Sequence, residues 1–333
     1  MQTTTNPADV ANRLQTYFSK KLLTHAVNEL RLNEFGMQAD LPQKAGSKTM
    51  RFYRPAQASR TGIETLTEGV PQTTYSELTT DYVDVTLLQR GKITKLSDVL
   101  QMIDILPFLQ MNIQNMGESA ALDADSITRD AIIAGMLNSD GYNERFAGVA
   151  ATGDSSDDFA TFNGLSNEAG RISRAFALGC ATQLKVNKAP KLKGQYVGII
   201  PPQVVHDFVQ DQDVLRAFQN VNTEKLWKGQ LGMVDGINYV EATNPFIEAA
   251  VYGTENTAGS NYSTIITGRD AYGVAKLAGT TSPWRPRVTI LNKADKSDPH
   301  NQFTLAGYKV FFNALLLNEN FLVVARTKST FQN

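Results

Sequence analysis

Apolar residues at steps of three and four predict one long helix between residues 107 and 137. At 1.5 Å per residue it would be about 46 Å long, with Pro107 near its start and Gly141 beyond its end. The apolar stripe consists of Leu109, Ile113, Met116, Ala120, Ala124, Ile127, Ala131 and Ala134. The acidic residues are expected largely on the other faces, and these are Glu118, Asp123, Asp125 and Asp130.

The pattern before this helix is different. Apolar residues at four-residue steps from Val10 to Leu22 follow Asn6-Pro7, which predicts an amphipathic first helix that ends near Gly36. Residues 55–80 contain seven threonines and little apolar periodicity, which is typical of an extended excursion with a turn near its middle, at Gly69-Val70-Pro71. Residues 82–87 then alternate between polar and apolar, which predicts a half-buried strand.

Helices and strands mix in the second half of the chain. Helices are expected at 169–186 and from Pro201-Pro202 onward, and short strands at 196–200, 237–241, 262–267 and 271–277. Two apolar strands, 308–317 and 321–326, flank the three residues 318–320, which predicts a C-terminal hairpin with both faces covered. The fold class is therefore α+β.

Length and composition limit the number of domains and the kinds of site that the chain can have. The 333 residues carry a formal net charge of -1, a length typical of about two domains. Cys180 is the single cysteine, which excludes an intrachain disulfide and a thiol-rich metal cluster. The N-terminus has neither the basic region nor the apolar region of a secretory signal, and no apolar run reaches the length of a membrane span.

The charges are segregated along the chain. Residues 1–54 hold eight basic and four acidic residues, whereas residues 98–158 hold eleven acidic and two basic ones. From residue 266 onward the balance is basic again. Segments of opposite sign attract each other, within one subunit or between copies.

No catalytic motif is found. The three histidines lie in different parts of the chain, and the phosphate-binding, dinucleotide-binding and zinc-protease patterns are missing. Two acidic groups are weak metal candidates: His206-Asp207 with Asp211 and Asp213, and the loop Asp154, Asp157 and Asp158. The first is also typical of a polar helix face, and the second lacks the pattern of a calcium loop. Cys180 is predicted to be an inert core thiol, so we expect no catalytic, cofactor-binding or metal-binding residue.

Several stretches, in order along nearly the whole chain, resemble the N-four-type family of tailed-phage major capsid proteins, which have the Hong Kong 97 capsid fold. The stretches are LQTYFSKKLL (14–23), KTMRFYRP (48–55), LTEGVP (66–71), ITKLSDVL (93–100), YVGIIPPQVVHDF (196–208), EKLWKGQLGMVDGINYVEATN (224–244) and AYGVAKL (271–277). The resemblance implies an N-terminal arm (1–50), an extended E-loop with flanking strands (51–90), a peripheral domain with the long helix as its spine (91–145), an axial domain (146–284), and C-terminal strands that complete the peripheral domain (285–333).

The implied function is that of a major capsid protein, which self-assembles as hexamers and pentamers into the icosahedral shell around the double-stranded DNA of a tailed phage. Implied partners are a separate scaffolding protein, since the first helix begins near Pro7 without a fused scaffold, and a portal. A decoration protein and weak, non-specific contact with DNA complete the set, with assembly in the bacterial cytoplasm and no membrane. Two alternatives stay open: the shell of an encapsulin-like compartment, and a soluble enzyme with an unrecognised site.

The charge pattern suggests that the basic arm of one copy lies against the acidic spine of another. The candidate contact residues are Arg13, Lys20, Lys21, Glu64, Glu68, Glu118, Asp123 and Asp130. Some proteins with this fold crosslink an E-loop lysine to an asparagine of a neighbour. Residues 55–80 contain Arg60 but no lysine, so the sequence predicts a shell held by non-covalent contacts.

Overall fold

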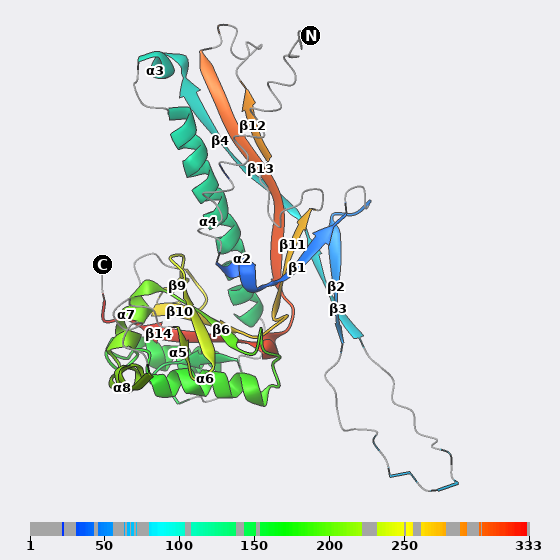
Figure 1. Ribbon diagram of the computed structural model, residues 1–333, viewed down its shortest axis with the longest axis vertical. Helices are drawn as coiled ribbons and strands as arrows, with labels where there is room; N and C mark the ends of the chain where they lie inside the picture. The colour runs from blue at the N-terminus through cyan, green and yellow to red at the C-terminus, as the bar shows by residue number, and fades with distance from the viewer. Residues whose placement is uncertain are drawn as a thin grey trace.

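The computed structural model has two parts joined by the long helix α4 (Phe108–Leu137), and a narrow two-stranded ribbon projects from the junction (Figure 1). An elongated part consists of α4 and one sheet, and a compact part is built around a second sheet. The described residues are 22, 31–42, 46–55, 63, 65–66, 68–69, 71, 80–103, 108–137, 143–150, 154–221, 232–249, 251–255, 261–277, 287–291, 300 and 302–331.

The first sheet is organised around the long strand β13. On one side β13 pairs antiparallel with β4 along its length. On the other side β11 and β12 pair with successive parts of β13, and β1 joins β11 in parallel. The strands are β1 (Met37–Leu41), β4 (Leu88–Ser97), β11 (Tyr272–Leu277), β12 (Arg287–Leu291) and β13 (Phe303–Leu316).

Period-two alternation gives β13 its two faces. Its even positions are mostly buried and pack against α4, among them Tyr308, Val310 and Phe312. Its odd positions are half-buried or exposed. The helix lies closest to its neighbours at its glycines. A Cβ added at Gly135 would lie only 2.7 Å from the Leu316 side chain.

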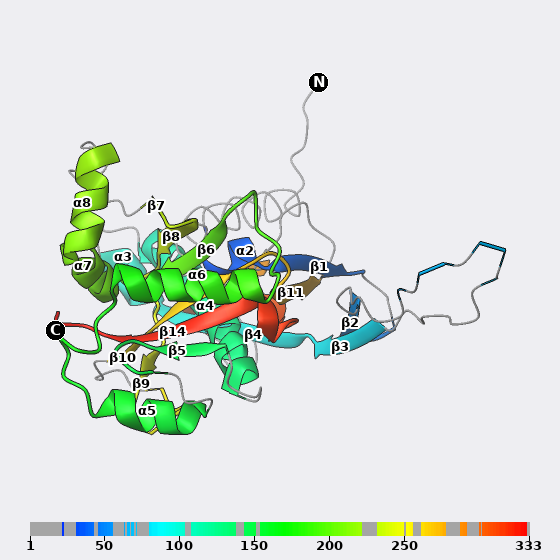
Figure 2. The same ribbon diagram turned by 90° about the horizontal axis from the view of Figure 1, so that it is seen from below.

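The second sheet forms the compact part. Figure 2 shows the helices α5 (Ser155–Asn163) and α6 (Arg174–Val186) on opposite sides of its strands β10 and β14. The helices α7 (Pro202–Gln210) and α8 (Gln212–Val221) follow its strand β6. Its strands are β5 (Glu144–Phe146), β6 (Tyr196–Ile200), β7 (Met233–Val234), β8 (Ile237–Glu241), β9 (Ile247–Glu248), β10 (Asn261–Thr267) and β14 (Leu322–Lys328).

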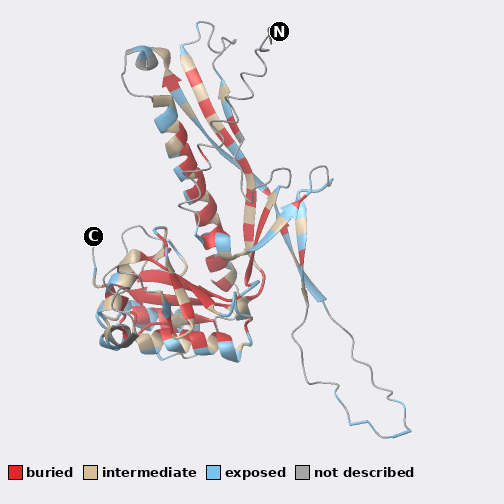
Figure 3. Ribbon diagram, viewed as in Figure 1, coloured by how far each residue is buried: buried red, intermediate tan, exposed pale blue. Residues whose placement is uncertain are grey.

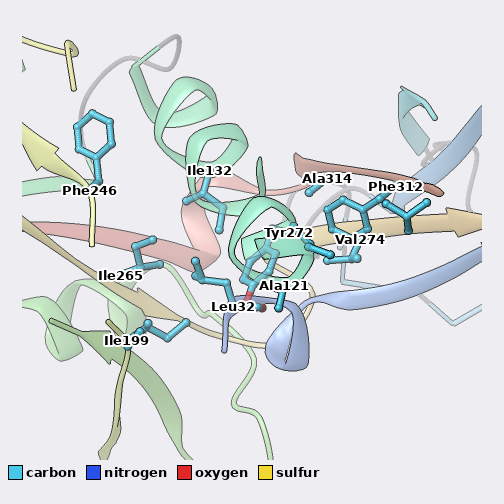
Figure 4. Packing of buried hydrophobic residues seen from close by; sticks show 14 of the residues in the cluster. Leu32, Ala121, Ile132, Ile199, Phe246, Ile265, Tyr272, Val274, Phe312 and Ala314 are labelled. Carbon is cyan, nitrogen blue, oxygen red and sulfur yellow. The ribbon is translucent and has the colours of Figure 1, made fainter. Parts of the chain in front are cut away.

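One apolar cluster runs through both parts. It contains Ile132 of α4, Phe312 of the first sheet and Ile265 of the second, so the helix packs on both sheets (Figure 4). The remaining elements are short or belong to the ribbon. They are α2 (Leu32–Phe35), the ribbon strands β2 (Thr49–Pro55) and β3 (Thr80–Thr86), α3 (Asp98–Ile103) and the 3₁₀ turn η1 (Glu319–Phe321).

Most predicted elements are confirmed. The long helix lies at 108–137, the half-buried strand becomes β3, and the strands at 196–200 and 237–241 have the predicted bounds. The helix expected at 169–186 begins at Arg174, because the Ser173 hydroxyl caps it by accepting the Phe176 N–H. Of the first helix, Leu22 and Leu32–Phe35 are described as helical, and the latter end before Gly36.

The predicted C-terminal hairpin is wrong. β13 belongs to the first sheet and β14 to the second, where β14 pairs with β10 and β5. The η1 turn carries the chain across, and the N–H groups of Leu317 and Asn318 both donate to the Ala271 carbonyl at 2.9 Å. The chain crosses in the same way between β10 and β11. These two adjacent crossings between the sheets replace the hairpin, because β13 and β14 each pair with a long strand of a different sheet.

Each of the two sheets takes strands from separate stretches of the chain. β11 lies within the range 146–284 but pairs in the first sheet, and β14 lies within 285–333 but pairs in the second. The stripe on α4 is confirmed as far as Ala124 and then moves to Thr128, Ile132 and Met136, whereas Ala134 is exposed. A true helical repeat of 3.6 residues drifts from a seven-residue pattern over this length.

Candidate assembly surfaces

The described residues contain no group of three or more His, Cys, Asp or Glu side chains that could hold a metal ion. In the same part of the chain, no helix combines the length and the apolarity needed to cross a membrane. Cys180 is fully buried, which confirms its predicted place in the core, and this burial raises the pKa of its thiol to about 12.

The two acidic metal candidates have structural roles instead. Asp207 is 2% exposed and accepts the Thr330 N–H at 2.8 Å, which ties the C-terminal strand end to α7. Asp211 accepts the Arg174 N–H at 2.7 Å. Asp154 caps α5 by accepting the Ser156 N–H at 2.8 Å. Asp154, Asp207 and Asp211 thus each accept a backbone hydrogen bond that supports the fold.

The predicted contact acids on α4 have different surroundings. Asp123 lies 3.2 Å from Arg90 of β4, and Asp130 lies 2.8 Å from Arg129, so both form ion pairs within the subunit. Glu118 is exposed. Asp125, expected on an outer face, is buried. Glu68 is exposed in a turn with Gly69, whose φ is +80°, and this confirms the turn near the middle of the excursion. Outside the described residues lie Arg13, Lys20, Lys21 and Glu64.

The β2–β3 ribbon carries an ordered aromatic and charged face. Arg51 donates two hydrogen bonds of 2.8 Å to Asp84, and its guanidinium lies 3.9 Å from the centre of the Tyr82 ring. Tyr53 stands opposite Tyr82 in the strand register, and the two are 70% and 56% exposed. Tyrosine and arginine are the residues that dominate binding energy at protein interfaces. This face is therefore ready for a partner with little further ordering.

The opposite face of the ribbon anchors it to the body. Phe52 and Val85 are buried in a small cluster with Leu317 and Ala275. Arg54 also donates to the Leu317 carbonyl at 3.0 Å. A two-stranded ribbon is marginal by itself, so these contacts hold it in a fixed direction away from the first sheet (Figure 1).

The face of the first sheet away from α4, which we call the outer sheet face, is apolar and basic. Ile93 and Leu291 are 75% and 59% exposed, and Figure 3 shows that β4 is exposed along most of its length. The strands β4, β12 and β13 contain no Asp or Glu. In register, the face presents Ile93, Lys95, Leu291, Leu305, Lys309 and Phe311.

Sequence reasoning missed this outer sheet face. A signal was present, because most odd positions of β13 are apolar or basic, and the neighbouring strands β4 and β12 lack acids. The predicted hairpin excluded an exposed sheet face, because a strand covered on both faces offers no exposed surface.

Comparisons with known proteins rest on the fold. No family model and no curated protein matches the sequence. Among solved structures, the capsid of cyanophage P-SCSP1u matches with a TM-score of 0.62 and 14% identity, covering 90% of this chain and 89% of that one. The cyanophage Pam1 capsid also gives 0.62, at 13% identity with 92% of each chain covered. The chain has the Hong Kong 97 capsid fold.

Other matches agree on this fold. The capsid of Ralstonia phage GP4 gives a TM-score of 0.60 at 14% identity, with 88% of each chain covered. An encapsulin complex from Synechococcus elongatus gives 0.51 at 9% identity, covering 91% of this chain and 89% of that one. The predicted α+β capsid fold is therefore confirmed.

Proposed function

We propose that this chain is the major capsid protein of a tailed phage, of the N-four type, which self-assembles into the icosahedral head shell around double-stranded DNA. The capsid fold along about 90% of the chain supports this function, together with the stretches that resemble that family. The proposal includes hexamers and pentamers of the chain, a separate scaffolding protein, a portal, a decoration protein and weak contact with DNA. It includes assembly in the host cytoplasm and a final location in the virion.

One observation carries the proposal: among the described residues, a single subunit has two ordered surfaces that no other part of the subunit covers. The ribbon holds an arginine–tyrosine face away from the body, and the outer sheet face exposes apolar and basic side chains together. Exposed apolar patches of this kind mark interaction sites. Head-to-tail contacts between identical copies close into rings when the rotation allows it.

The E-loop of a second copy fits the outer sheet face by charge and polarity. Ile63 and Leu66 are 75% and 71% exposed, and the sequence flanks them with Glu64 and Glu68. The outer sheet face offers exposed apolar side chains beside Lys95 and Lys309. Complementary charges fix the register of such a contact.

The basic arm of a neighbour is proposed to lie on α4. Of the acids first named for this contact, Asp123 and Asp130 already form ion pairs within the subunit. Glu118 is exposed on the helix and is therefore the acid that we propose for contact with the arm residues Arg13, Lys20 and Lys21.

Electron microscopy of the purified protein tests the function. We expect closed shells or, with scaffolding protein added, closed shells of uniform size. An encapsulin-like compartment has the same fold, so the genes beside this one discriminate: a packaging ATPase and a portal support a phage head. A soluble, non-assembling protein with enzymatic activity would contradict the proposal.

The mature shell is expected to be free of covalent links between subunits. Residues 55–80 contain no lysine to act as nucleophile, and Cys180, buried in α6, is the single cysteine. Denaturing electrophoresis of mature particles without reductant should therefore return one band at 36.5 kDa. A ladder of multimers would show that the prediction is wrong.

A further inference from the structure

The chain segment that enters the first sheet is held by three buried side chains from two different elements. Asp125 of α4 accepts the Leu32 N–H at 2.9 Å, and Tyr272 of β11 donates to the Leu32 carbonyl at 2.6 Å. Thr128 of α4 donates to Asn33 Oδ1 at 2.7 Å. All three are at most 1% exposed. We call this group of hydrogen bonds the α2 node.

Apolar contacts reinforce the α2 node. Figure 4 shows the Leu32 side chain beside Tyr272 and Ala121, and Leu32 is 2% exposed. Further toward the N-terminus, Leu22 is fully buried, and its carbonyl passes so close to α4 that a Cβ at Gly117 would lie 2.6 Å from it. The segment is thus docked along the helix at two points.

Asp125 is an unusual residue for this place. It is 1% exposed, and none of the ion pairs among the described residues involves it. The nearest cation on α4, Arg129, is already engaged: it lies 2.8 Å from Asp130 and 2.9 Å from Glu255. A buried carboxylate without an ion-pair partner is costly in its charged form.

We propose that Asp125 is a proton-operated latch: the segment that begins at Leu32 docks more firmly on α4 when this carboxyl group takes up a proton. Undocking exposes Asp125 to water, where its charged form is stable. Docking therefore favours the neutral form of Asp125, and acidification strengthens the docking of the segment on α4. This goes beyond the shell function, because it makes the docking of Leu32–Phe35 on α4 depend on pH in any assembly of the chain.

The groups around Asp125 set the range of pH over which the latch operates. Burial raises the pKa of Asp125 to about 6, against which the backbone N–H groups of residues 31–33 and the charge of Arg129 act in the lowering direction. Among the residues that the structure describes, Tyr272 and Glu34 are the other titratable groups near the α2 node. Burial raises the pKa of Tyr272, which therefore stays neutral.

The sign follows from proton linkage. Between the ordinary aspartate pKa near 4 and the docked value, the docked state binds more protons than the undocked state. Docking is therefore strongest below this window, weakens as pH rises through it, and stays weak above pH 6 to 7. From these two values, the docking equilibrium is expected to strengthen about tenfold between pH 7.5 and pH 5.0.

Hydrogen exchange of the Leu32–Phe35 amides in the full chain tests the latch. After correction for intrinsic exchange rates, protection should rise about tenfold from pH 7.5 to pH 5.0. The variant Asp125→Asn, which does not titrate, should show the same protection at both pH values. Asp123→Asn is the matched control, because this acid lies two residues away on the same helix and is partly exposed; it should keep the tenfold change.

A second variant separates the latch from simple loss of structure. Tyr272→Phe removes one hydrogen bond of the α2 node and should lower protection at both pH values while the ratio between them stays near ten. Equal protection of the wild-type amides at both pH values would overturn the proposal. So would an unchanged pH dependence in Asp125→Asn. If that variant fails to fold, a wild-type profile with no inflection near pH 6 contradicts the latch equally.

Discussion

Replacing Arg326 by alanine is expected to lower the free energy of unfolding by about 3–5 kcal/mol. Arg326 of β14 is 1% exposed, and it donates to Glu144 of β5 at 2.8 Å. Glu248 of β9 lies 3.7 Å from its guanidinium and is also buried. Burial raises the pKa of Glu248, with the charge of Arg326 acting against it. Without the arginine, these two buried carboxylates have no counter-ion.

Chemical denaturation of the unassembled subunit measures this effect. Arg269→Ala is the control, because Arg269 is 60% exposed and pairs with an exposed Asp270. Its loss should cost less than about 1 kcal/mol. The combined variant Arg326→Met, Glu144→Gln and Glu248→Gln removes every charge of the cluster and should recover most of the lost stability. A single Arg326→Ala variant as stable as wild type would refute the assigned role.

Local patterns predicted the elements well, because those elements follow from short-range rules. The long helix has an apolar stripe that repeats at helical spacing, the strand at 196–200 is a short apolar run, and the strand at 237–241 alternates buried Ile237 and Tyr239 with less buried residues. The path between sheets could not be predicted in the same way. A three-residue loop between two apolar strands favours a hairpin, and the partners that override it, β4 and β10, lie far away in the chain.

The polar interior was equally hidden from the sequence. Asp125 looks like any other acid on a helix with an acidic outer face, and its burial depends on Leu32, 93 positions away. Glu144 and Arg326 are 182 positions apart. Periodicity assigns a residue to a face, but it does not tell which distant backbone group will cover that face.

Reversing the charges of the outer sheet face is expected to abolish shell assembly while leaving the subunit folded. In the variant Lys95→Glu with Lys309→Glu, the acidic E-loop proposed to dock there meets like charges. Both lysines are exposed, and each ammonium group lies over a neighbouring ring. Each substitution should therefore lower the stability of the unassembled subunit by no more than about 1 kcal/mol. Replacing attraction by repulsion at every such contact should reduce the yield of closed particles about tenfold or more, because about 1.4 kcal/mol per contact already corresponds to a factor of ten.

A charge exchange makes the test specific. The variant Glu64→Lys with Glu68→Lys should assemble as poorly as the lysine variant, and the fourfold variant that combines both pairs should assemble again, because the contact regains opposite charges in reversed positions. Lys188→Glu with Lys193→Glu is the matched control for net charge, since both lysines are exposed in the compact part; it should assemble normally. Particle yield is measured by sedimentation and microscopy. A fourfold variant as defective as either double variant would show that these two surfaces do not meet.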